Sequence, residues 1–349
     1  MLFSVLRTII ICSGIVTGKI ELDHISTVSF LPDGVTTLVF VQLDFFEVVD
    51  IKNIHKIIFQ AGSKEELLPG FVPDFPYIAS RVEMDDYLDR SAPWHWHGAV
   101  ELSYTQKGCL CYHTPGGMAL LPEGSAILVN ANVLHMTTAE PGTVQLLHIF
   151  EPSLLGRMES RIGERYLTPL AAAGQVEMLP LLPSDPAHTA VLEQIKEAFR
   201  LSPDEFGYEV RLRNTLAEIW LVLFELARPL LSAPARRRES SEKIKEMMIY
   251  IHEHYSEKIT VSDLAGAAFL SERECFRAFR ECLHTTPVEY MKSYRLQQAC
   301  RLLLEIKAPV TEVGQLCGLG SSSYFGKTFR DAMGCTPSEY RRKWQDIDN

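Results

Sequence analysis

A unit that occurs twice near the C-terminal end is the feature that most constrains the fold of this 349-residue chain. The segment Thr286-Pro287-Val288-Glu289-Tyr290 recurs as Thr336-Pro337-Ser338-Glu339-Tyr340, which lies 50 residues later. Ser271 and Ser321 keep the same separation. Since a repeat that holds its register over this length is hard to obtain by chance, it predicts two copies of one supersecondary unit.

Each copy has the layout of a helix-turn-helix, in which a short helix and a tight turn precede a second helix that opens at a serine N-cap. In the second copy Gly318 follows the short helix, at a position that favours a positive φ. The second helix is expected over 322–331, with Phe325 and Phe329 facing the core. Its outward side chains are small, polar or cationic, which suits a DNA major groove about 12 Å wide. These outward residues are Ser322, Ser323, Gly326, Lys327 and Arg330.

The first copy follows the same pattern with different side chains. Its second helix is expected to bury Cys275, Ala278 and Phe279, and Phe269 occupies the turn position that Gly318 holds in the second copy. An exposed phenylalanine on this helix can contact thymine methyl groups, and an exposed arginine can bind guanine. The residues expected to face outward are Arg273, Glu274, Phe276, Arg277 and Arg280.

The distribution of charge favours DNA binding over the alternative of a helical bundle with no nucleic-acid partner. The formal net charge of the chain is −10, which taken alone argues against a nucleic-acid partner. However, residues 241–349 carry 15 basic and 15 acidic side chains, so the whole excess of acid lies in residues 1–240. Residues 292–345 carry 9 basic and 4 acidic side chains. These cations can replace phosphate counterions, and the predicted affinity for DNA falls with salt.

At this point residues 242–345 resemble the DNA-binding domain of the AraC/XylS family of bacterial transcription regulators, including the closing Gly334-Cys335-Thr336-Pro337-Ser338-Glu339-Tyr340-Arg341. The resemblance implies two helix-turn-helix modules joined by a long helix, here about 288–304, that bind successive segments of the major groove. By position, the residues that the resemblance assigns to base contacts are Arg273, Phe276, Arg277, Ser322, Ser323, Gly326 and Lys327.

Upstream of this domain, short alternating segments separated by turn signals predict an antiparallel β-barrel or sandwich. Three of the expected strands are 100–104, 126–129 and 144–150, and Glu140-Pro141-Gly142 is one of the turns between them. The predicted fold class is therefore α+β and multidomain: an antiparallel β-barrel or sandwich, then helices, then an all-α domain with two helix-turn-helix modules.

A cluster of candidate ligands lies in the expected barrel. His95, His97 and Glu101 are separated by even numbers of residues, so on a strand they share one face, and His135 follows on a later strand. His95, His97, Glu101 and Gly108 resemble the first sequence motif of cupin barrels. Gly124 and His135 resemble the second motif more loosely, since Asn130 and Asn132 replace its usual Pro and Gly. This resemblance implies a cupin-like barrel of the jelly-roll type. The four residues His95, His97, Glu101 and His135 are predicted to bind either a small organic effector, such as a sugar, or a divalent Mn, Fe, Ni or Zn ion. Purely structural histidines and a metal-dependent cupin enzyme are the remaining alternatives.

The next region is expected to be helical. Apolar residues at Leu212, Leu216, Ile219, Leu223 and Leu226 recur at helical spacing. This stripe predicts either a homodimer surface or core packing against the barrel. The polar segment that follows, with its three consecutive arginines at 236–238, predicts a linker.

Composition limits the remaining possibilities. No run of about 20 apolar residues occurs, so no membrane-spanning segment is expected. Eight scattered cysteines without a CxxC pair fit a reducing cytoplasm. The whole sequence predicts a cytoplasmic, ligand-controlled transcription regulator, activating by resemblance, that contacts operator DNA, an effector and RNA polymerase and is not an enzyme. The expected regions are 1–62, an unassigned extension; 63–152, the sensor barrel; 153–230, helical support and dimerisation; 231–241, the linker; and 242–345, the DNA-binding domain.

Overall fold

The computed structural model describes residues 74–232 and 238–345, together with the short pieces 28–29, 40–41, 58–59, 66–68 and 71–72. The chain divides into a unit of residues 1–49 and a unit of residues 50–349. In the first unit, β1 (Val28–Ser29) pairs antiparallel with β2 (Phe40–Val41). Most of the predicted extension 1–62 and residues 233–237 of the predicted linker 231–241 lie outside the described residues.

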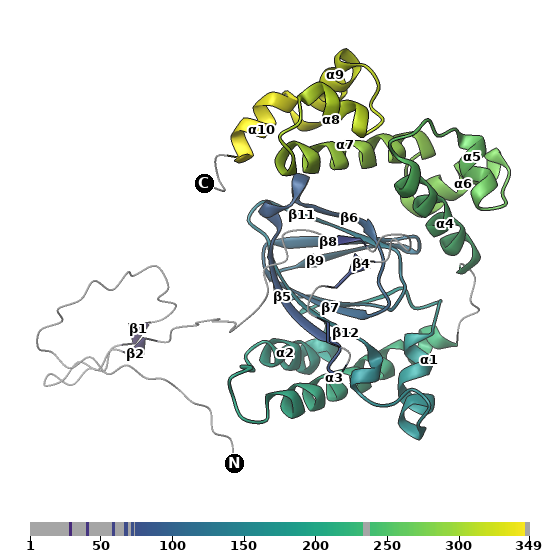
Figure 1. The fold of residues 1–349 in the computed structure, drawn as a ribbon. Helices are drawn as coiled ribbons and strands as arrows, with labels where there is room; N and C mark the ends of the chain where they lie inside the picture. Colours follow the sequence, from purple (N-terminus) through teal and green to yellow (C-terminus); the bar gives the residue numbers. More distant parts are fainter. Residues whose placement is uncertain are drawn as a thin grey trace, which may run out of the picture. The chain divides into compact units, whose positions relative to one another are not determined.

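The sensor region of the second unit consists of two antiparallel sheets that face each other (Figure 1). The five-stranded sheet has the order β13 (Met178–Leu181), β10 (Ala126–Val129), β7 (Val100–Lys107), β12 (Val144–Phe150) and β5 (Tyr77–Glu83). The four-stranded sheet has the order β6 (Ser91–His95), β11 (His135–Ala139), β8 (Cys109–Thr114) and β9 (Gly117–Pro122). A further pair joins β3 (Ile58–Phe59) to β4 (Glu66–Leu67).

The three strands predicted from alternation are confirmed as β7, β10 and β12, but the expected barrel is not closed, because no ladder joins the two sheets in the described residues. Leu110 and Leu121 of the smaller sheet and Ile127 and Leu147 of the larger one lie in one buried cluster between the sheets. The layout is therefore the expected antiparallel jelly-roll type in the form of a sandwich.

The region after β12 is mostly helical, as predicted, but it also contributes strand β13 to the edge of the larger sheet. This strand lies inside the region 153–230 that was predicted to be helical, and its Pro180 is compatible with an edge position. Several short helical turns connect the larger elements. Between β5 and β6 these are η1 (Met84–Asp86) and η2 (Leu88–Arg90). After β12 they are η3 (Pro152–Leu154), η4 (Gly163–Leu167), α1 (Thr168–Ala171) and η5 (Pro186–His188).

Helices α2 (Thr189–Ala198) and α3 (Tyr208–Leu231) lie beside the five-stranded sheet (Figure 1). Trp220 of α3 contacts Phe150 of β12, with ring centroids 6.4 Å apart, and Phe199 stacks on His148 of the same strand. Four residues of the predicted apolar stripe are buried and Leu226 is half-buried, so the stripe packs within the chain. This packing favours the core alternative over a dimer surface for these side chains.

The C-terminal region is helical throughout its described length, as predicted. Its helices are α4 (Arg238–His254), α5 (Val261–Ala267), α6 (Glu272–Leu283), α7 (Pro287–Glu305), α8 (Val310–Leu316), α9 (Ser322–Met333) and α10 (Pro337–Gln345). Helix α7 joins the two helix-turn-helix modules (Figure 1) and matches the predicted linking helix within one residue at each end. Helix α4 begins four residues before the predicted domain boundary at 242.

The predicted caps and turns are confirmed in both modules. Ser271 accepts a hydrogen bond from the backbone N–H of Glu274, and Ser321 accepts one from that of Tyr324. Gly318 has a φ of 64°, and Phe269, its counterpart in the first module, has a φ of 56°. Among the described residues, no helix is both long and apolar enough to cross a bilayer.

Candidate sensor site and DNA-binding helices

The four predicted ligand residues lie together in the sensor sandwich. One possible ligand atom from each of His95, His97, Glu101 and His135 lies within 4.8 Å of the others, and all four residues are buried. His135 is directly opposite His95 in the ladder between β11 and β6. The structure therefore brings together the four residues that the sequence singled out.

The strand argument that grouped these residues was wrong in one respect. Strand β6 ends at His95 and β7 begins at Val100, so His97 and Glu101 do not continue one strand. Between those two residues the chain passes from the four-stranded sheet to the five-stranded sheet. The four side chains meet because both sheets contribute to one interior, whereas even spacing along a single strand does not describe their arrangement.

The three imidazole rings are held in one orientation by the backbone. The Nδ1 atom of each ring lies 2.7–2.9 Å from a carbonyl oxygen two residues away. A carbonyl oxygen only accepts, so each Nδ1 carries a proton, and in the neutral ring Nε2 then carries the lone pair. This arrangement fixes the tautomer in the way that is usual for metal-bound histidines. The accepting carbonyls are those of Pro93, Ala99 and Val133.

The distances at the centre of the cluster fit ligands that share one ion. Glu101 Oε2 lies 3.5 Å from the Nε2 atoms of both His97 and His135, which is longer than an ordinary hydrogen bond. Both Nε2 atoms are buried and have no hydrogen-bond partner. Bonds of about 2.0–2.2 Å to a single ion place neighbouring ligands about 3–3.5 Å apart. The donor set of three imidazoles and one carboxylate therefore fits a divalent transition metal.

A hydrogen-bonded network holds the carboxylate of Glu101. Tyr112 of β8 donates its hydroxyl hydrogen to Glu101 Oε1 and accepts a hydrogen bond from Gln145 Nε2. Gln145 also donates to Ser103 Oγ over 2.9 Å. All these side chains are buried, so the network fixes one carboxylate oxygen and leaves Oε2 facing the imidazoles. Sequence reasoning missed Tyr112 and Gln145, because they lie on other strands with no motif around them.

The electrostatics of the cluster favour the metal-binding forms of His95 and Glu101. Burial and the two neighbouring imidazoles hold the pKa of His95 well below its usual range. Burial would raise the pKa of Glu101, but His135 and His97 outweigh it and hold that pKa well below its ordinary value. A neutral imidazole and an ionised carboxylate are the forms that bind a divalent ion. Burial would lower the pKa of His97, but the carboxylates of Glu101 and Glu66 outweigh it and raise that pKa.

A second carboxylate, which sequence reasoning also missed, lies at the edge of the cluster. Glu66 Oε2 is 3.5 Å from His95 Nε2, and the side chain of Glu66 is only 7% exposed. Burial raises the pKa of Glu66 to about 7. The backbone N–H of Glu66 donates to the carbonyl of Trp96 over 3.0 Å, which ties β4 to the cluster. Glu66 follows no recognisable spacing, and only the tertiary fold brings it to this place.

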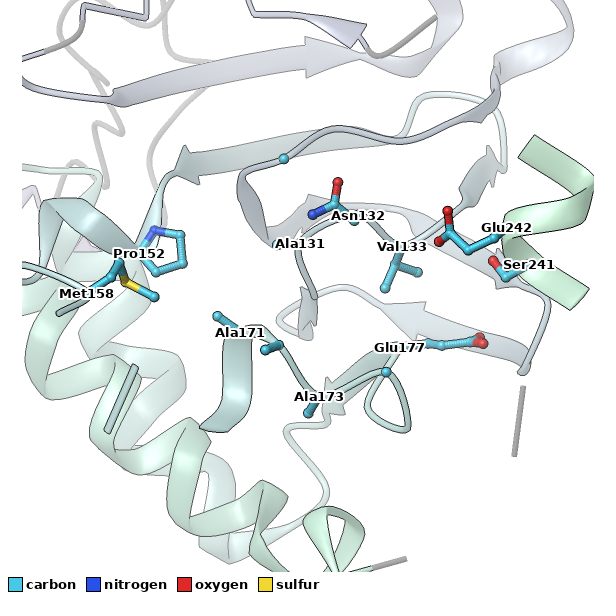
Figure 2. Close-up of a pocket in the computed structure, with 13 residues that line it drawn as sticks. Ala131, Asn132, Val133, Pro152, Met158, Ala171, Ala173, Glu177, Ser241 and Glu242 are labelled. Atoms are coloured by element: carbon cyan, nitrogen blue, oxygen red, sulfur yellow. The ribbon is translucent and has the colours of Figure 1, made fainter. Parts of the chain in front are cut away.

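Two cavities near the cluster differ greatly in size. The cavity that reaches Glu66, His95 and Glu101 has a volume of about 40 Å³. A larger pocket of about 310 Å³ lies where the loop containing Asn132 meets the end of α1 and the start of α4 (Figure 2). Small side chains line much of it, with Glu177 and Glu242 as its acidic members.

The predicted DNA-contacting residues mostly lie on exposed faces of α6 and α9. Phe325 and Phe329 are buried in the core of the second module, and Cys275, Ala278 and Phe279 are buried in the first, as predicted. On α6 three arginines are exposed and two residues are half-buried; on α9 four residues are exposed and Gly326 is half-buried. The exposed members are Arg273, Arg277, Arg280, Ser322, Ser323, Lys327 and Arg330.

Two of the candidate DNA-contacting residues on α6 also make contacts within the first module. The carboxylate of Glu274 accepts a hydrogen bond from the backbone N–H of Ser271 over 2.9 Å, which completes a capping box. Phe276 is half-buried. Tyr324, which sequence reasoning left out, is 54% exposed at the start of α9.

Comparison with known proteins assigns both halves of the chain. Residues 78–219 match the family described as "AraC-like ligand binding domain", and residues 264–343 match the family described as "Helix-turn-helix domain". The chain belongs to the AraC family of transcription regulators. It is a ligand-controlled, DNA-binding regulator, as predicted from the two-part architecture.

Individual relatives of this AraC-type regulator carry similar descriptions. The "Uncharacterized HTH-type transcriptional regulator YdeC" of Bacillus subtilis (strain 168) is 26% identical over 283 residues, which cover 80% of this chain and 96% of the relative. The "Probable transcriptional regulator LumQ" of Photobacterium leiognathi is 25% identical over 259 residues, covering 73% and 94%. A crystal structure of an AraC-type DNA-binding domain protein from Chromobacterium violaceum is 29% identical, covers 30% of this chain and 93% of its own, and has a TM-score of 0.29.

Proposed function

We propose that this AraC-type regulator responds to a divalent transition-metal ion held by His95, His97, Glu101 and His135, and that it is not an enzyme. The observation that carries the proposal is the convergence of buried Nε2 atoms without hydrogen-bond partners on a carboxylate 3.5 Å away. Leaving such polar atoms unpaired is costly unless a ligand satisfies them. A bound ion would supply a charged centre that all four donors can satisfy together.

The size of the cavity supports an ion over an organic effector at these four residues. A volume of about 40 Å³ holds only a few water molecules, since one buried water needs about 10–15 Å³. Pockets for small organic ligands are about 300–1,000 Å³. A sugar therefore fits the pocket of about 310 Å³ in Figure 2 better than the space beside the histidines.

Three finer parts of the function are inferred from the family resemblance. We infer that the regulator acts as a homodimer, contacts RNA polymerase and works in the cytoplasm, where its operator DNA lies. On α3 the buried leucines serve the core, so a dimer contact through this helix would use its outer face, where Leu221 is 45% exposed and Leu230 is 42% exposed.

Metal analysis of the purified protein tests the proposal. We expect close to one divalent ion per chain, lost on His95→Ala and retained on His113→Ala. His113 is a matched control, because it lies in the same sheet on β8 and takes no part in the cluster. Retention of the ion by the His95→Ala variant, or a wild-type chain that binds a sugar but no ion, would contradict the proposal.

A DNA-binding assay separates the metal-responsive regulator from a metal-dependent enzyme. The purified protein is first used to select genomic fragments, and one bound fragment then serves as the operator. We expect removal of the ion by a chelator to change operator affinity about fivefold or more, the range typical of allosteric coupling. An ion that leaves operator affinity unchanged would favour the enzyme alternative.

A further inference from the structure

The segment that carries two of the histidines also presents two tryptophans to the DNA-binding domain. In Trp94-His95-Trp96-His97 the side chains alternate, and the histidines lie in the sensor interior. Trp94 and Trp96 are 8% and 6% exposed, and they belong to the apolar cluster that forms the core of the first helix-turn-helix module. One short segment therefore contacts the predicted ion with one face and the first module with the other.

Helix α4 contributes several residues to this contact. Its apolar face packs in the same cluster as the two tryptophans, with Leu134 of the sensor beside them. All the members from α4 are fully buried, so the contact is continuous with the core of the first module. The members from α4 are Ile244, Met247, Met248 and Ile251.

Lys245 of α4 is the polar centre of the contact and is only 6% exposed. Its Nζ donates a hydrogen bond to the carbonyl oxygen of Asn132 over 2.6 Å and lies 5.5 Å from the centroid of the Trp96 ring. It also lies 3.1 Å from Glu242 Oε1 on the same helix. A buried ammonium group needs such partners, and displacing the sensor would remove the Asn132 carbonyl and the Trp96 ring from Lys245.

The loop that accepts this hydrogen bond also positions two of the histidines. The N–H of Asn132 donates to the carbonyl of His97 over 2.8 Å, and the carbonyl of Val133 accepts from His135 Nδ1 over 2.9 Å. Asn132 has a φ of 61°, a conformation that few residues other than glycine adopt readily. A shift of either histidine would therefore move the carbonyl that Lys245 contacts. Figure 2 shows this junction, with Asn132 and Glu242 on the same pocket.

We propose that Lys245 is a positioning residue that couples ion binding in the sensor to docking of the first helix-turn-helix module. The coupling rests on the proposed metal-responsive function. Arg273 and Arg277 are exposed while the module is docked, so docking does not cover these candidate base contacts. It fixes the position of α6 relative to the sensor. By linkage, any factor by which the ion strengthens docking is the factor by which docking strengthens ion binding.

Substitution of two lysines on α4 in the full-length chain tests the coupling. Lys245→Met keeps an unbranched side chain only one atom shorter and removes the ammonium group that contacts Asn132. Lys243→Met is the matched control, since Lys243 lies on the same helix and pairs with Glu246 over 2.9 Å. With zinc as the probe and a competing chelator, we expect Lys245→Met to weaken ion affinity about fivefold or more and Lys243→Met to leave it unchanged.

A second measurement needs no variant. Zinc is expected to reduce acrylamide quenching of tryptophan fluorescence in the wild-type chain, because tighter docking shields Trp94 and Trp96. Equal zinc affinity in both lysine variants, or quenching that zinc does not change, would overturn the coupling and leave the proposed metal site intact. A wild-type chain that binds no zinc, manganese, iron or nickel ion would overturn the proposed function and the coupling with it.

Discussion

Two residues of the first helix-turn-helix module hold a left-handed backbone where the second module has glycine. Phe269 and His284 have φ values of 56° and 53°, and their counterparts Gly318 and Gly334 have values of 64° and 71°. Side chains with a Cβ atom are strained in this region. The sequence placed Phe269 at the turn position that Gly318 holds in the second module, and the structure shows the same backbone conformation there with a residue less suited to it.

The strain at Phe269 leads to a stability prediction. Phe269 is 91% exposed, so replacing it loses little buried surface. We expect Phe269→Gly to raise the free energy of unfolding by about 1 kcal/mol, measured by urea denaturation of the DNA-binding region. Gly318→Ala is expected to lower it, because a Cβ there would lie 2.5 Å from the carbonyl oxygen of Tyr255. A destabilised Phe269→Gly variant would contradict the assignment of strain.

A buried histidine outside the metal cluster predicts how acid affects the sensor. His148 stacks on Phe199, its Nδ1 lies 2.7 Å from the hydroxyl oxygen of Tyr77, and burial lowers its pKa to about 3 from an ordinary 6.5. The unfolded chain therefore binds a proton below pH 6.5 that the folded chain does not. This group's contribution to stability is complete above pH 6.5 and is lost between pH 6.5 and 3, at about 1.4 kcal/mol per pH unit.

The test compares wild type with His148→Gln in urea titrations of the sensor between pH 7 and pH 4.5. We expect the dependence of unfolding free energy on pH to be shallower in the variant by about one proton. Equal slopes in the two proteins would show that His148 is protonated in the folded state.

At the scale of elements, the pattern of apolar residues predicted helices more completely than the sensor interior. Helix α7 and the caps at Ser271 and Ser321 follow from local signals, namely periodicity, N-cap serines and Thr-Pro pairs. Strand β13 escaped prediction because Met178–Leu181 is short and contains a proline. Glu66 and Tyr112 escaped because their place at the cluster depends on contacts between segments distant in sequence, which no local pattern encodes. Glu66 donates its backbone N–H to the carbonyl of Trp96, and Tyr112 pairs with Thr137 of β11.

Arg277 on α6 and Lys327 on α9 are exposed cations that we predict to contact DNA bases. We expect Arg277→Ala and Lys327→Ala each to weaken operator binding about tenfold or more and to change base preference, as loss of a base contact does. Arg213→Ala is a suitable control, since Arg213 is exposed on α3 of the sensor region. Competition between operator and random DNA measures both effects. Unchanged affinity and preference in both variants would exclude these side chains from recognition.

For the whole molecule, the distribution of charge and the arrangement of elements both separate a sensor region from a DNA-binding region. The acidic excess lies in residues 1–240, and residues 292–345, which comprise most of α7 and the second module, carry the basic excess. The sensor and the first module share an apolar cluster, and the proposed coupling between sensor occupancy and the position of α6 would act through this contact. The sequence alone indicated both domains and the four candidate ligands. It did not indicate the contact between the domains, because Trp96 and Lys245 are far apart in the chain and meet only through folding.

Operator affinity measured with and without a bound divalent ion tests this account most directly. The full-length wild type and the His95→Ala variant are compared on the same operator fragment, with ion content determined for each sample. We expect about one ion per wild-type chain and a change in operator affinity of about fivefold or more when the ion is removed. In His95→Ala we expect operator affinity to stay the same with and without the ion. A wild-type chain that binds the operator with the same affinity whether or not the ion is present would contradict this account.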